Sequence, residues 1–224
     1  MIAARGLGWS PGGRAVLDAF DLDVARGQLS AIVGRSGCGK SSLLRLLAGV
    51  RAPDRGTVSG VPSRRGFVFQ DPALLPWRSL RDNVALPGQL GVDTEAVDAA
   101  IARVGLADHA DKLPGELSGG QRMRASLARA LVSRPEILFL DEPFAALDGA
   151  TRRDLASIVA ALLPGVTVVM VTHDLADAAR LADRVVLVDG PPLRVVLDLP
   201  LSSERPRAPS EVAAVVARVE AVGA

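Results

Sequence analysis

The chain has 224 residues, with 26 Lys and Arg against 25 Asp and Glu, so its formal net charge is +1. That length suits one domain with a full hydrophobic core. The balanced charge gives no reason to expect nucleic acid or an anionic membrane surface as a partner. Cys38 is the only cysteine, which excludes a disulfide framework and favours the cytosol. We expect neither a signal peptide in Met1–Trp9 nor a transmembrane segment.

Short apolar runs alternate with helical patterns along the chain. The runs are Leu29–Val33, Gly66–Phe69, Ile137–Leu140, Val166–Val171 and Val185–Val188. Because they are continuously apolar, they predict the buried strands of a largely parallel α/β sheet that is covered on both faces. Arg51–Arg65, rich in Gly, Pro, Arg and Ser, predicts loops or a small antiparallel β part, and Glu211–Ala224 predicts at most a short amphipathic helix.

Residues 72–133 have a different pattern from the rest of the chain. Ala and Leu recur there at helical spacing, and strand signals are lacking. We therefore expect a helical subdomain inserted at 72–133. Residues 1–71 and 134–224 would form the α/β core of a single domain, 1–224.

A phosphate-binding loop is the strongest motif. Gly34–Ser41 reads Gly-Arg-Ser-Gly-Cys-Gly-Lys-Ser, which fits G-x-x-x-x-G-K-[ST], and it lies between a predicted strand and a predicted helix. Backbone N–H groups and the positive helix end would then face a polyphosphate. Lys40 would reach the β- and γ-phosphates, and the Ser41 hydroxyl would bind Mg²⁺. The residues expected at the nucleotide are Gly34, Arg35, Ser36, Gly37, Cys38, Gly39, Lys40, Ser41 and Ser42.

Two acids end a later buried strand. Ile137–Leu140 is followed by Asp141, Glu142 and Pro143. Adjacent buried carboxylates are costly unless positive charge or hydrogen bonds meet them. A Mg²⁺ ion beside the phosphates would supply that charge, with Asp141 holding the metal and Glu142 deprotonating the attacking water.

A second helix start is suited to an anion. Ser118 precedes Gly119, Gly120 and Gln121, and then a helical run. Ser118 is a good N-cap, and the glycines leave the first N–H groups accessible. Two phosphate-facing helix ends far apart in one sequence suggest a dimer in which each nucleotide lies between the loop of one subunit and Ser118 of the other.

Together, these motifs resemble those of the ABC transporter ATPases in order and spacing. The segments that carry the resemblance are Gly34–Ser41, Gln70, Leu117–Gln121, Ile137–Pro143, Ala146–Asp148 and His173. The resemblance implies a P-loop NTPase core with a small antiparallel β part, and Mg-ATP as the cofactor pair. It implies that Gln70 contacts Mg²⁺ and the attacking water, that Asp148 couples the two sites of a dimer, and that His173 contacts the γ-phosphate. Trp9 becomes the candidate for stacking on adenine, with a place in the core as the alternative.

Residues 69–84 further resemble the nitrate, sulfonate and taurine branch of bacterial importers. This implies an ATP-hydrolysing subunit at the cytoplasmic face of the inner membrane. It would pair with a second copy or a homologous ATPase, bind a permease through residues 70–84, and act on a solute-binding protein only indirectly. Within that region we expect Leu74–Trp77 to line a groove, and Leu80 and Val84 to be buried.

The main alternative is a soluble ABC-type ATPase outside transport, but the short stretch between Ser41 and Ser118 leaves no room for the coiled-coil arm of the DNA-repair type. A P-loop kinase or GTPase would need neither the Ser-Gly-Gly helix nor Gln70. His109 reads as a solvated loop histidine.

Overall fold

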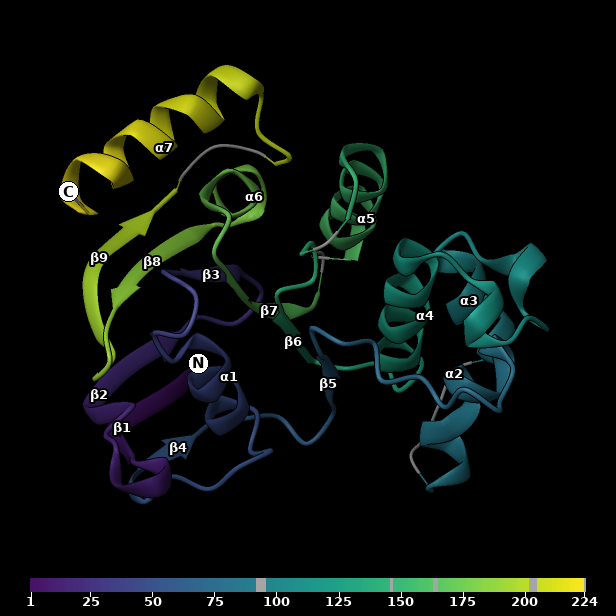
Figure 1. The fold of residues 1–224 in the computed structure, drawn as a ribbon, viewed down its shortest axis with the longest axis horizontal. Coiled ribbons are helices and arrows are strands. Elements are labelled where there is room, and N and C mark those ends of the chain that lie inside the picture. Colours follow the sequence, from purple (N-terminus) through teal and green to yellow (C-terminus); the bar gives the residue numbers. More distant parts are fainter. Residues whose placement is uncertain (92–95, 146, 163–164, 202–204, 224) are drawn as a thin grey trace.

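The structure, a computed structural model, describes residues 1–91, 96–145, 147–162, 165–201 and 205–223. Ala146 of the Ala-Leu-Asp motif and Ala224 of the predicted tail helix lie outside these ranges. The described chain combines a large mixed sheet, a small antiparallel sheet and helices (Figure 1). The predicted α/β fold class is therefore confirmed.

The large sheet has six strands in the order β5-β6-β7-β3-β8-β9. Its strands are β3 (Leu29–Val33), β5 (Arg65–Val68), β6 (Ile137–Asp141), β7 (Thr167–Thr172), β8 (Arg184–Asp189) and β9 (Arg194–Pro200). Neighbours from β5 to β8 pair in parallel, and only β9 runs antiparallel, along β8. The five predicted apolar runs therefore form the parallel part of this sheet.

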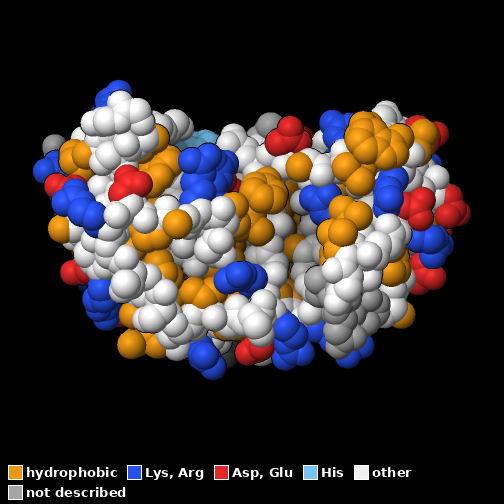
Figure 2. All heavy atoms as spheres, turned by 90° about the horizontal axis from the view of Figure 1, so that it is seen from below, with side chains coloured by type: hydrophobic (Ala, Val, Ile, Leu, Met, Phe, Trp, Pro, Cys, Tyr) orange, Lys and Arg blue, Asp and Glu red, His pale blue; other side chains and the backbone are white. Residues whose placement is uncertain are grey.

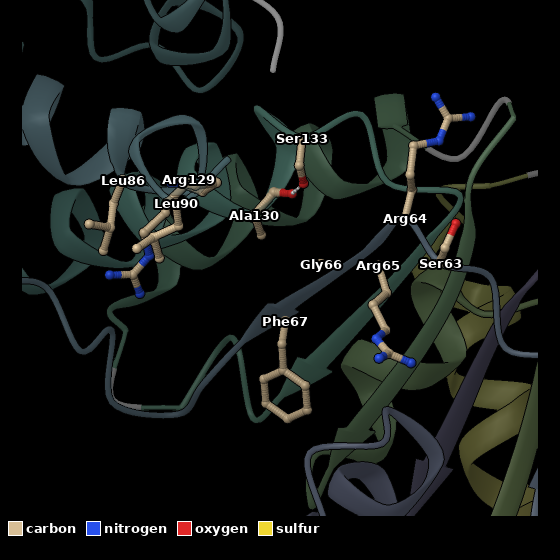
Figure 3. A pocket seen from close by; sticks show the side chains of 11 residues that line it. Ser63, Arg64, Arg65, Gly66, Phe67, Leu86, Leu90, Arg129, Ala130 and Ser133 are labelled. Carbon is tan, nitrogen blue, oxygen red and sulfur yellow. Dashed lines mark hydrogen bonds between the residues drawn. The ribbon is translucent and has the colours of Figure 1, made fainter. Parts of the chain in front are cut away.

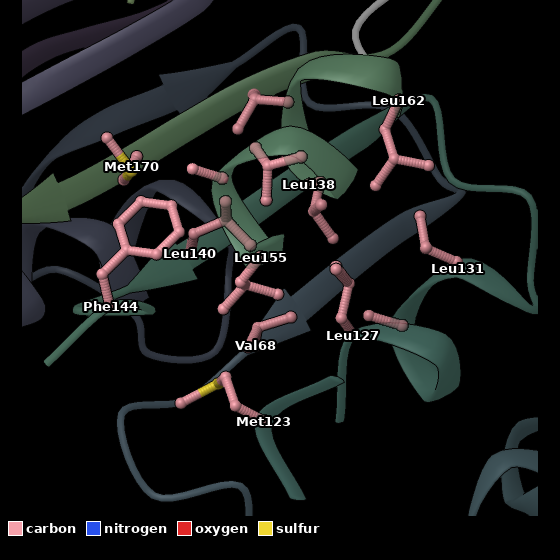
Figure 4. Packing of buried hydrophobic residues seen from close by; sticks show 14 of the residues in the cluster. Val68, Met123, Leu127, Leu131, Leu138, Leu140, Phe144, Leu155, Leu162 and Met170 are labelled. Atoms are coloured by element: carbon pink, nitrogen blue, oxygen red, sulfur yellow. The ribbon is translucent and has the colours of Figure 1, made fainter. Parts of the chain in front are cut away.

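Both faces of the parallel strands are buried, which explains their unbroken apolar sequences. Ala31, Leu138 and Met170 belong to a cluster shared with α4, α5 and α6, whereas Ile32 and Phe139 face α1 and the small sheet. Figure 4 shows the first cluster, where Met123 and Leu127 of α4 meet side chains of the sheet. These helices are α1 (Lys40–Leu47), α4 (Gly119–Leu131), α5 (Gly149–Leu162) and α6 (Leu175–Leu181).

The small sheet has the order β2-β1-β4, with both pairs antiparallel. Its strands are β1 (Ile2–Trp9), β2 (Leu17–Val24) and β4 (Arg55–Ser59). The predicted antiparallel part is confirmed in β4, but the sequence analysis missed β1, β2 and β9. Register shifts interrupt β1 on both sides and β9 along β8, so these strands lack a clean period-2 pattern.

Between β5 and β6 the described residues form helices and turns. The α-helices are α2 (Leu80–Gln89), α3 (Val97–Arg103) and α4, joined by short 3₁₀ turns at Ala107–His109 and Pro114–Glu116. The boundaries 72 and 133 of an inserted subdomain stay a prediction. The C-terminal helix α7 (Pro209–Gly223) begins two residues before the predicted tail helix and packs on α6. Within the described ranges, no helix combines the length and apolarity needed to cross a bilayer.

Candidate functional site

A cavity of about 450 Å³ lies where β3, β6 and β7 end. The carboxyl ends of parallel strands are where α/β sheets bind ligands. Four separate segments supply its predicted site residues, and β1 supplies Trp9. The predicted residues that line it are Trp9, Ser36, Gly37, Gly39, Lys40, Ser41, Ser42, Gln70, Glu142 and His173.

The loop from Gly34 to Gly39 needs its glycines for two physical reasons. Gly37 and Gly39 have φ of +80° and +119°, conformations that residues with a side chain rarely adopt. A Cβ at Gly34 would overlap the Val188 carbonyl oxygen. The loop then enters α1 at Lys40, so the first N–H groups of this helix are directed toward the cavity end of β3.

Lys40 is buried and satisfied by its own loop. Its Nζ donates to the carbonyl oxygens of Gly34 at 2.8 Å and Arg35 at 2.9 Å, and it lies 3.8 Å from Glu142 Oε1. The ammonium is thus held beneath the loop, where an anion would gain from a charge-assisted contact.

Ser41 lines the cavity and bonds Asp141, which is buried behind it and is not part of the cavity lining. Ser41 Oγ donates to Asp141 Oδ1 at 2.6 Å, and Arg45 lies 3.5 Å from Asp141 Oδ2. Hydroxyl and carboxylate oxygens are the hard ligands that Mg²⁺ takes alongside phosphate and water. Among the described residues, no three His, Cys, Asp or Glu side chains gather as a metal site. A Mg²⁺ ion that keeps water and phosphate ligands needs no such cluster, so Ser41 and Asp141 fit it.

The sequence analysis missed Arg45, although a signal was present. Arg45 follows Ser41 by four residues on α1, and side chains four apart share one helix face. Arg45 therefore reaches the same carboxylate as Ser41. It balances part of the charge of Asp141, which is fully buried.

Glu142 and His173 form a contact across β6 and β7. The Nδ1 of His173 lies 2.9 Å from Glu142 Oε2, and the backbone N–H of His173 donates to the same oxygen at 3.3 Å. Glu142 has φ of +49°, an unusual conformation for a residue with a side chain, held by its N–H bond to the Val171 carbonyl. Because Nδ1 of His173 contacts the Glu142 carboxylate, Nε2 of the same ring is available to a ligand.

Trp9 lines the cavity beside Val16, as an adenine-stacking residue would. The Arg51 guanidinium carbon lies 5.3 Å from the centre of the Trp9 ring, a cation–π contact that the sequence analysis missed. Because Trp9 is only half-buried, one face of the ring can be shared with a ligand. Stacking on adenine stays a prediction.

Three predicted loop residues do not line this cavity. Gly34 and Arg35 line a neighbouring one, together with Leu187 and Val188. Cys38 is 2% exposed and packs into the apolar cluster around α1. This side chain therefore completes the core, and a place for Cys38 at the nucleotide stays a prediction. Only the Cys38 backbone remains for a nucleotide.

The predicted partner-facing residues Ser118, Gly119, Gly120, Gln121 and Asp148 are also absent from the cavity lining. Ser118 and Gly119 are exposed at the start of α4, which Figure 1 shows on the side of the molecule away from α1. Ser118 Oγ accepts from Gln121 N at 3.2 Å, and Gln121 Oε1 accepts from Ser118 N at 2.9 Å, which closes a capping box. The helix start is thus capped by its own side chains without a ligand.

His109 also contacts this helix start. Its Nε2 lies 2.9 Å from Gln121 Nε2, and the ring is half-buried. The reading of His109 as a solvated loop residue is therefore wrong. Its partner lies twelve positions along the chain, so the local sequence gave no sign of the contact.

Asp148 caps the first turn of α5, and Thr151 of that turn lies against the start of α4. It accepts from the backbone N–H groups of Ala150 and Thr151 at 3.0 Å and from the Thr151 hydroxyl at 2.8 Å. The bonds from Thr151 hold the pKa of Asp148 below its ordinary value. Gly120 packs so closely on Thr151 that an added Cβ would overlap the threonine methyl group.

The region predicted to bind a permease is partly exposed. Leu80 and Val84 are fully buried, as predicted, whereas Trp77 is 72% exposed. Figure 2 shows a face hollowed between the helical part at the right and the larger part of the molecule. A cavity of about 430 Å³ is lined by residues of β5, α2 and α4 (Figure 3), among them Phe67, Leu86 and Arg129, but by none of Leu74–Trp77.

Comparisons with known proteins agree with this geometry. The family model described as ABC transporter matches residues 17–145. The chain is 48% identical, over 88% of its length and 71% of the relative, to an aliphatic sulfonates import ATP-binding protein, SsuB, of Ralstonia nicotianae. It is 46% identical to SsuB 1 of Mesorhizobium japonicum, over 90% of the chain and 80% of the relative.

Solved structures show the same fold. The ATP-binding cassette MJ0796, in a dimeric post-hydrolysis state bound to ADP and Pi, matches with a TM-score of 0.79 and 26% identity, over 91% of this chain and 100% of the other. The dimeric structure of MJ0796 as a bacterial ABC transporter cassette gives 0.80 and 27%, with the same coverage. By its sequence motifs, its fold and these relatives, the chain belongs to the ABC transporter family.

Proposed function

We propose that the chain is the ATP-binding and ATP-hydrolysing subunit of an importer for aliphatic sulfonates. The observation that carries the proposal is the single cavity into which four chain segments bring Lys40, Ser41, Gln70, Glu142 and His173. The names of the SsuB relatives support the importer and its class of solute. The proposed location is peripheral, at the cytoplasmic face of the inner membrane.

Five residues that line the cavity, together with Asp141 next to Ser41, have distinct roles in hydrolysis. Lys40 binds the β- and γ-phosphates, and Ser41, Gln70 and Asp141 would hold a Mg²⁺ ion, which adds positive charge beside the phosphates when bound. Glu142 accepts the proton of the attacking water. His173 contacts the γ-phosphate with the ring nitrogen that Glu142 leaves free. The buried Glu142 carboxylate is held in place by its contact with His173 and by the nearby Lys40 ammonium.

The proposed active unit is a dimer. Ser118 and Gly119 are exposed and lie outside the cavity of their own chain, so they can contact a nucleotide only in a second chain. The dimeric structures of MJ0796 support this arrangement. Two nucleotides would then be enclosed, each between the phosphate loop of one chain and Ser118 of the other.

The permease partner is proposed to dock beside α2. The predicted region 70–84 adjoins the cavity lined by Phe67, Leu86 and Leu90 (Figure 3), which offers an apolar floor for a helix of a membrane subunit. Arg129 lines the same cavity and donates to the Pro72 and Ala73 carbonyls at 2.7 and 2.8 Å. The docking surface is thereby tied to the segment that follows Gln70.

Glu142→Gln tests the proposed chemistry. The amide keeps the shape of the side chain but accepts no proton, so hydrolysis of Mg-ATP should fall by roughly 10²–10⁴-fold, the range for a lost general base. ATP should still bind, because the phosphate loop is intact, and an ATP-bound dimer should accumulate. Phosphate release and size-exclusion chromatography measure these effects.

The controls separate the function from its alternative. Phosphate release by Glu142→Gln at the rate of the unmodified chain would remove Glu142 from the reaction, and no release by the unmodified chain would remove the ATPase itself. Co-expression with a candidate sulfonate permease distinguishes a transport subunit from a soluble ABC-type ATPase. Only the transport subunit is expected to co-purify with the permease in detergent.

A further inference from the structure

Arg152 of α5 joins two acids at the start of α6. Its Nη1 lies 2.6 Å from Asp174 Oδ2 and 3.5 Å from Asp177 Oδ2. The first distance is a short charge-assisted hydrogen bond. One guanidinium thus links a helix that begins just after Asp148 to a helix that begins just after His173.

Asp174 is fixed by bonds at both of its carboxylate oxygens and at its backbone. Its Oδ1 accepts from the N–H groups of Ala176 at 2.9 Å and Asp177 at 3.1 Å, which makes it the N-cap of α6. Its own N–H donates to Thr172 Oγ1 at 3.0 Å. Asp174 follows His173 directly in the chain, so the bond from Arg152 acts one residue away from the imidazole.

The arginine is itself held on a rigid base. Its backbone N–H donates to the Asp148 carbonyl at 2.9 Å, within the turn that the Asp148 carboxylate caps. Thr151, the preceding residue, is in close contact with Gly120 of α4. A continuous series of packed contacts therefore runs from the start of α4 through the first turn of α5 to the start of α6.

Arg152 balances the charges of two acids, so its loss should matter more than the loss of an isolated surface ion pair. Two carboxylates, Asp174 and Asp177, face it, and the Asp177 side chain is only 11% exposed. Exposed ion pairs contribute little because solvent screens them and long side chains lose entropy. Here removal of the cation would leave two adjacent acids, one of them buried, next to the loop that carries His173.

We propose that Arg152 is a positioning residue for His173. By holding Asp174 against α5, it fixes the His173 loop relative to Asp148 and to the start of α4. The inference rests on the proposed function, in which His173 contacts the γ-phosphate of ATP. It adds a residue that touches neither nucleotide nor metal.

The test compares Arg152→Met with Arg153→Met. Both variants remove a guanidinium from the first turns of α5, but Arg153 is exposed, and it is Arg152 whose guanidinium bonds the acids at the start of α6. We expect Arg152→Met to lower kcat for Mg-ATP hydrolysis about tenfold with little change in the Kd for ATP, because a small displacement of a positioned group costs rate more than binding. Arg153→Met should stay within about twofold of the unmodified chain in both.

Two further variants identify the partner of Arg152. Arg152→Lys, which keeps a positive charge, should restore most of the rate. Asp174→Asn keeps an N-cap acceptor and loses the charge, so it should reproduce the loss alone and add nothing to Arg152→Met. Equal rates for Arg152→Met and Arg153→Met, or independent losses from Arg152→Met and Asp174→Asn, would overturn the proposal.

A readout independent of hydrolysis keeps the two proposals separable. The chain has two histidines, so the His173 ring signal can be assigned by NMR through its loss in His173→Gln. That signal should shift in Arg152→Met and not in Arg153→Met; an unmoved signal overturns the positioning role. An unmodified chain that hydrolyses no ATP, with the shift present, counts against the proposed function alone.

Discussion

The phosphate loop and the start of α4 differ in how their polar groups are satisfied. At the loop, Lys40, Asp141 and Glu142 are buried, and each charge has a partner within the chain. At the start of α4, Ser118 and Gly119 are exposed, and Gln121 of the same helix closes the cap. Both helix starts, the one after the phosphate loop and the one at Ser118, are suited to an anion. Only the first is enclosed by its own chain.

This difference has a consequence for binding. A phosphate at the loop must share Lys40 with the Gly34 and Arg35 carbonyls, within a site whose charges are already balanced. At α4 the exposed cap needs no such exchange, and it contributes only when another surface meets it. In the proposed dimer, the enclosed loop therefore provides the affinity of one chain for its nucleotide. The exposed start of α4 adds its contact only when the second chain meets it.

Among the tests of this comparison, Ser118→Asp at the start of α4 is expected to lower hydrolysis most. Aspartate caps a helix as well as serine, so α4 should stay folded, while the new charge would face the γ-phosphate of the partner's nucleotide. We expect hydrolysis to fall about 10²-fold, the scale for losing one donor at developing charge, with ATP binding by the isolated chain unchanged. Ser118→Asn is the neutral control, and phosphate release is the measurement.

A mixture of variants then tests whether the two ends act between chains. Lys40→Ala lacks the loop contact and Ser118→Asp lacks the α4 contact, so each variant alone should keep only a small part of the activity. In an equal mixture, half of the dimers would contain one intact site, which should return about a quarter of the activity. A mixture no more active than its components would rule out the shared site.

Trp9→Leu tests how the nucleotide is bound at the phosphate loop. If adenine stacks on Trp9, losing the ring should raise the Kd for ATP about tenfold, since stacking on an aromatic side chain contributes 1–3 kcal/mol per base. The other tryptophan, Trp77, is 72% exposed and provides the matched control, Trp77→Leu. Calorimetric titration would decide, and equal affinities for both variants would return Trp9 to a purely structural role.

The sequence predicted some elements of the fold well and others not at all. The parallel strands were found nearly to the residue, because runs such as Ile137–Leu140 are buried on both faces and need no partner to be recognised. The Ser118 cap was also a local signal, since its partner Gln121 lies three residues away. Strands β1 and β9 were missed because bulges and small or exposed residues obscure their period.

Contacts between distant segments could not be predicted in this way. Arg51 lies over Trp9, and His109 meets Gln121, only because the fold brings these segments together. Cys38 was placed in the cradle by its position in the motif, whereas its side chain is buried in the apolar core. A motif specifies the path of the backbone, and packing decides where each side chain points.

Asp177 offers an effect on stability alone and a contrast with the acids at the phosphate loop. The acids of the loop end are matched by cations, but burial of Asp177 and repulsion by Asp174 raise its pKa to about 6, although Arg152, Arg180 and His173 oppose the rise. A carboxyl with a raised pKa stabilises the fold fully below its unfolded pKa, near 3.9, and that contribution is lost as the pH rises through about 6.

The unfolding free energy should therefore lose up to about 3 kcal/mol through this group between pH 4 and pH 7, from a shift of about two pKa units. In Asp177→Asn that loss is absent, so the variant should gain stability over the unmodified chain as the pH rises. Urea unfolding of both proteins at several pH values measures the difference, in which the other titrating groups largely cancel. Parallel curves would mean that folding does not raise the pKa of Asp177.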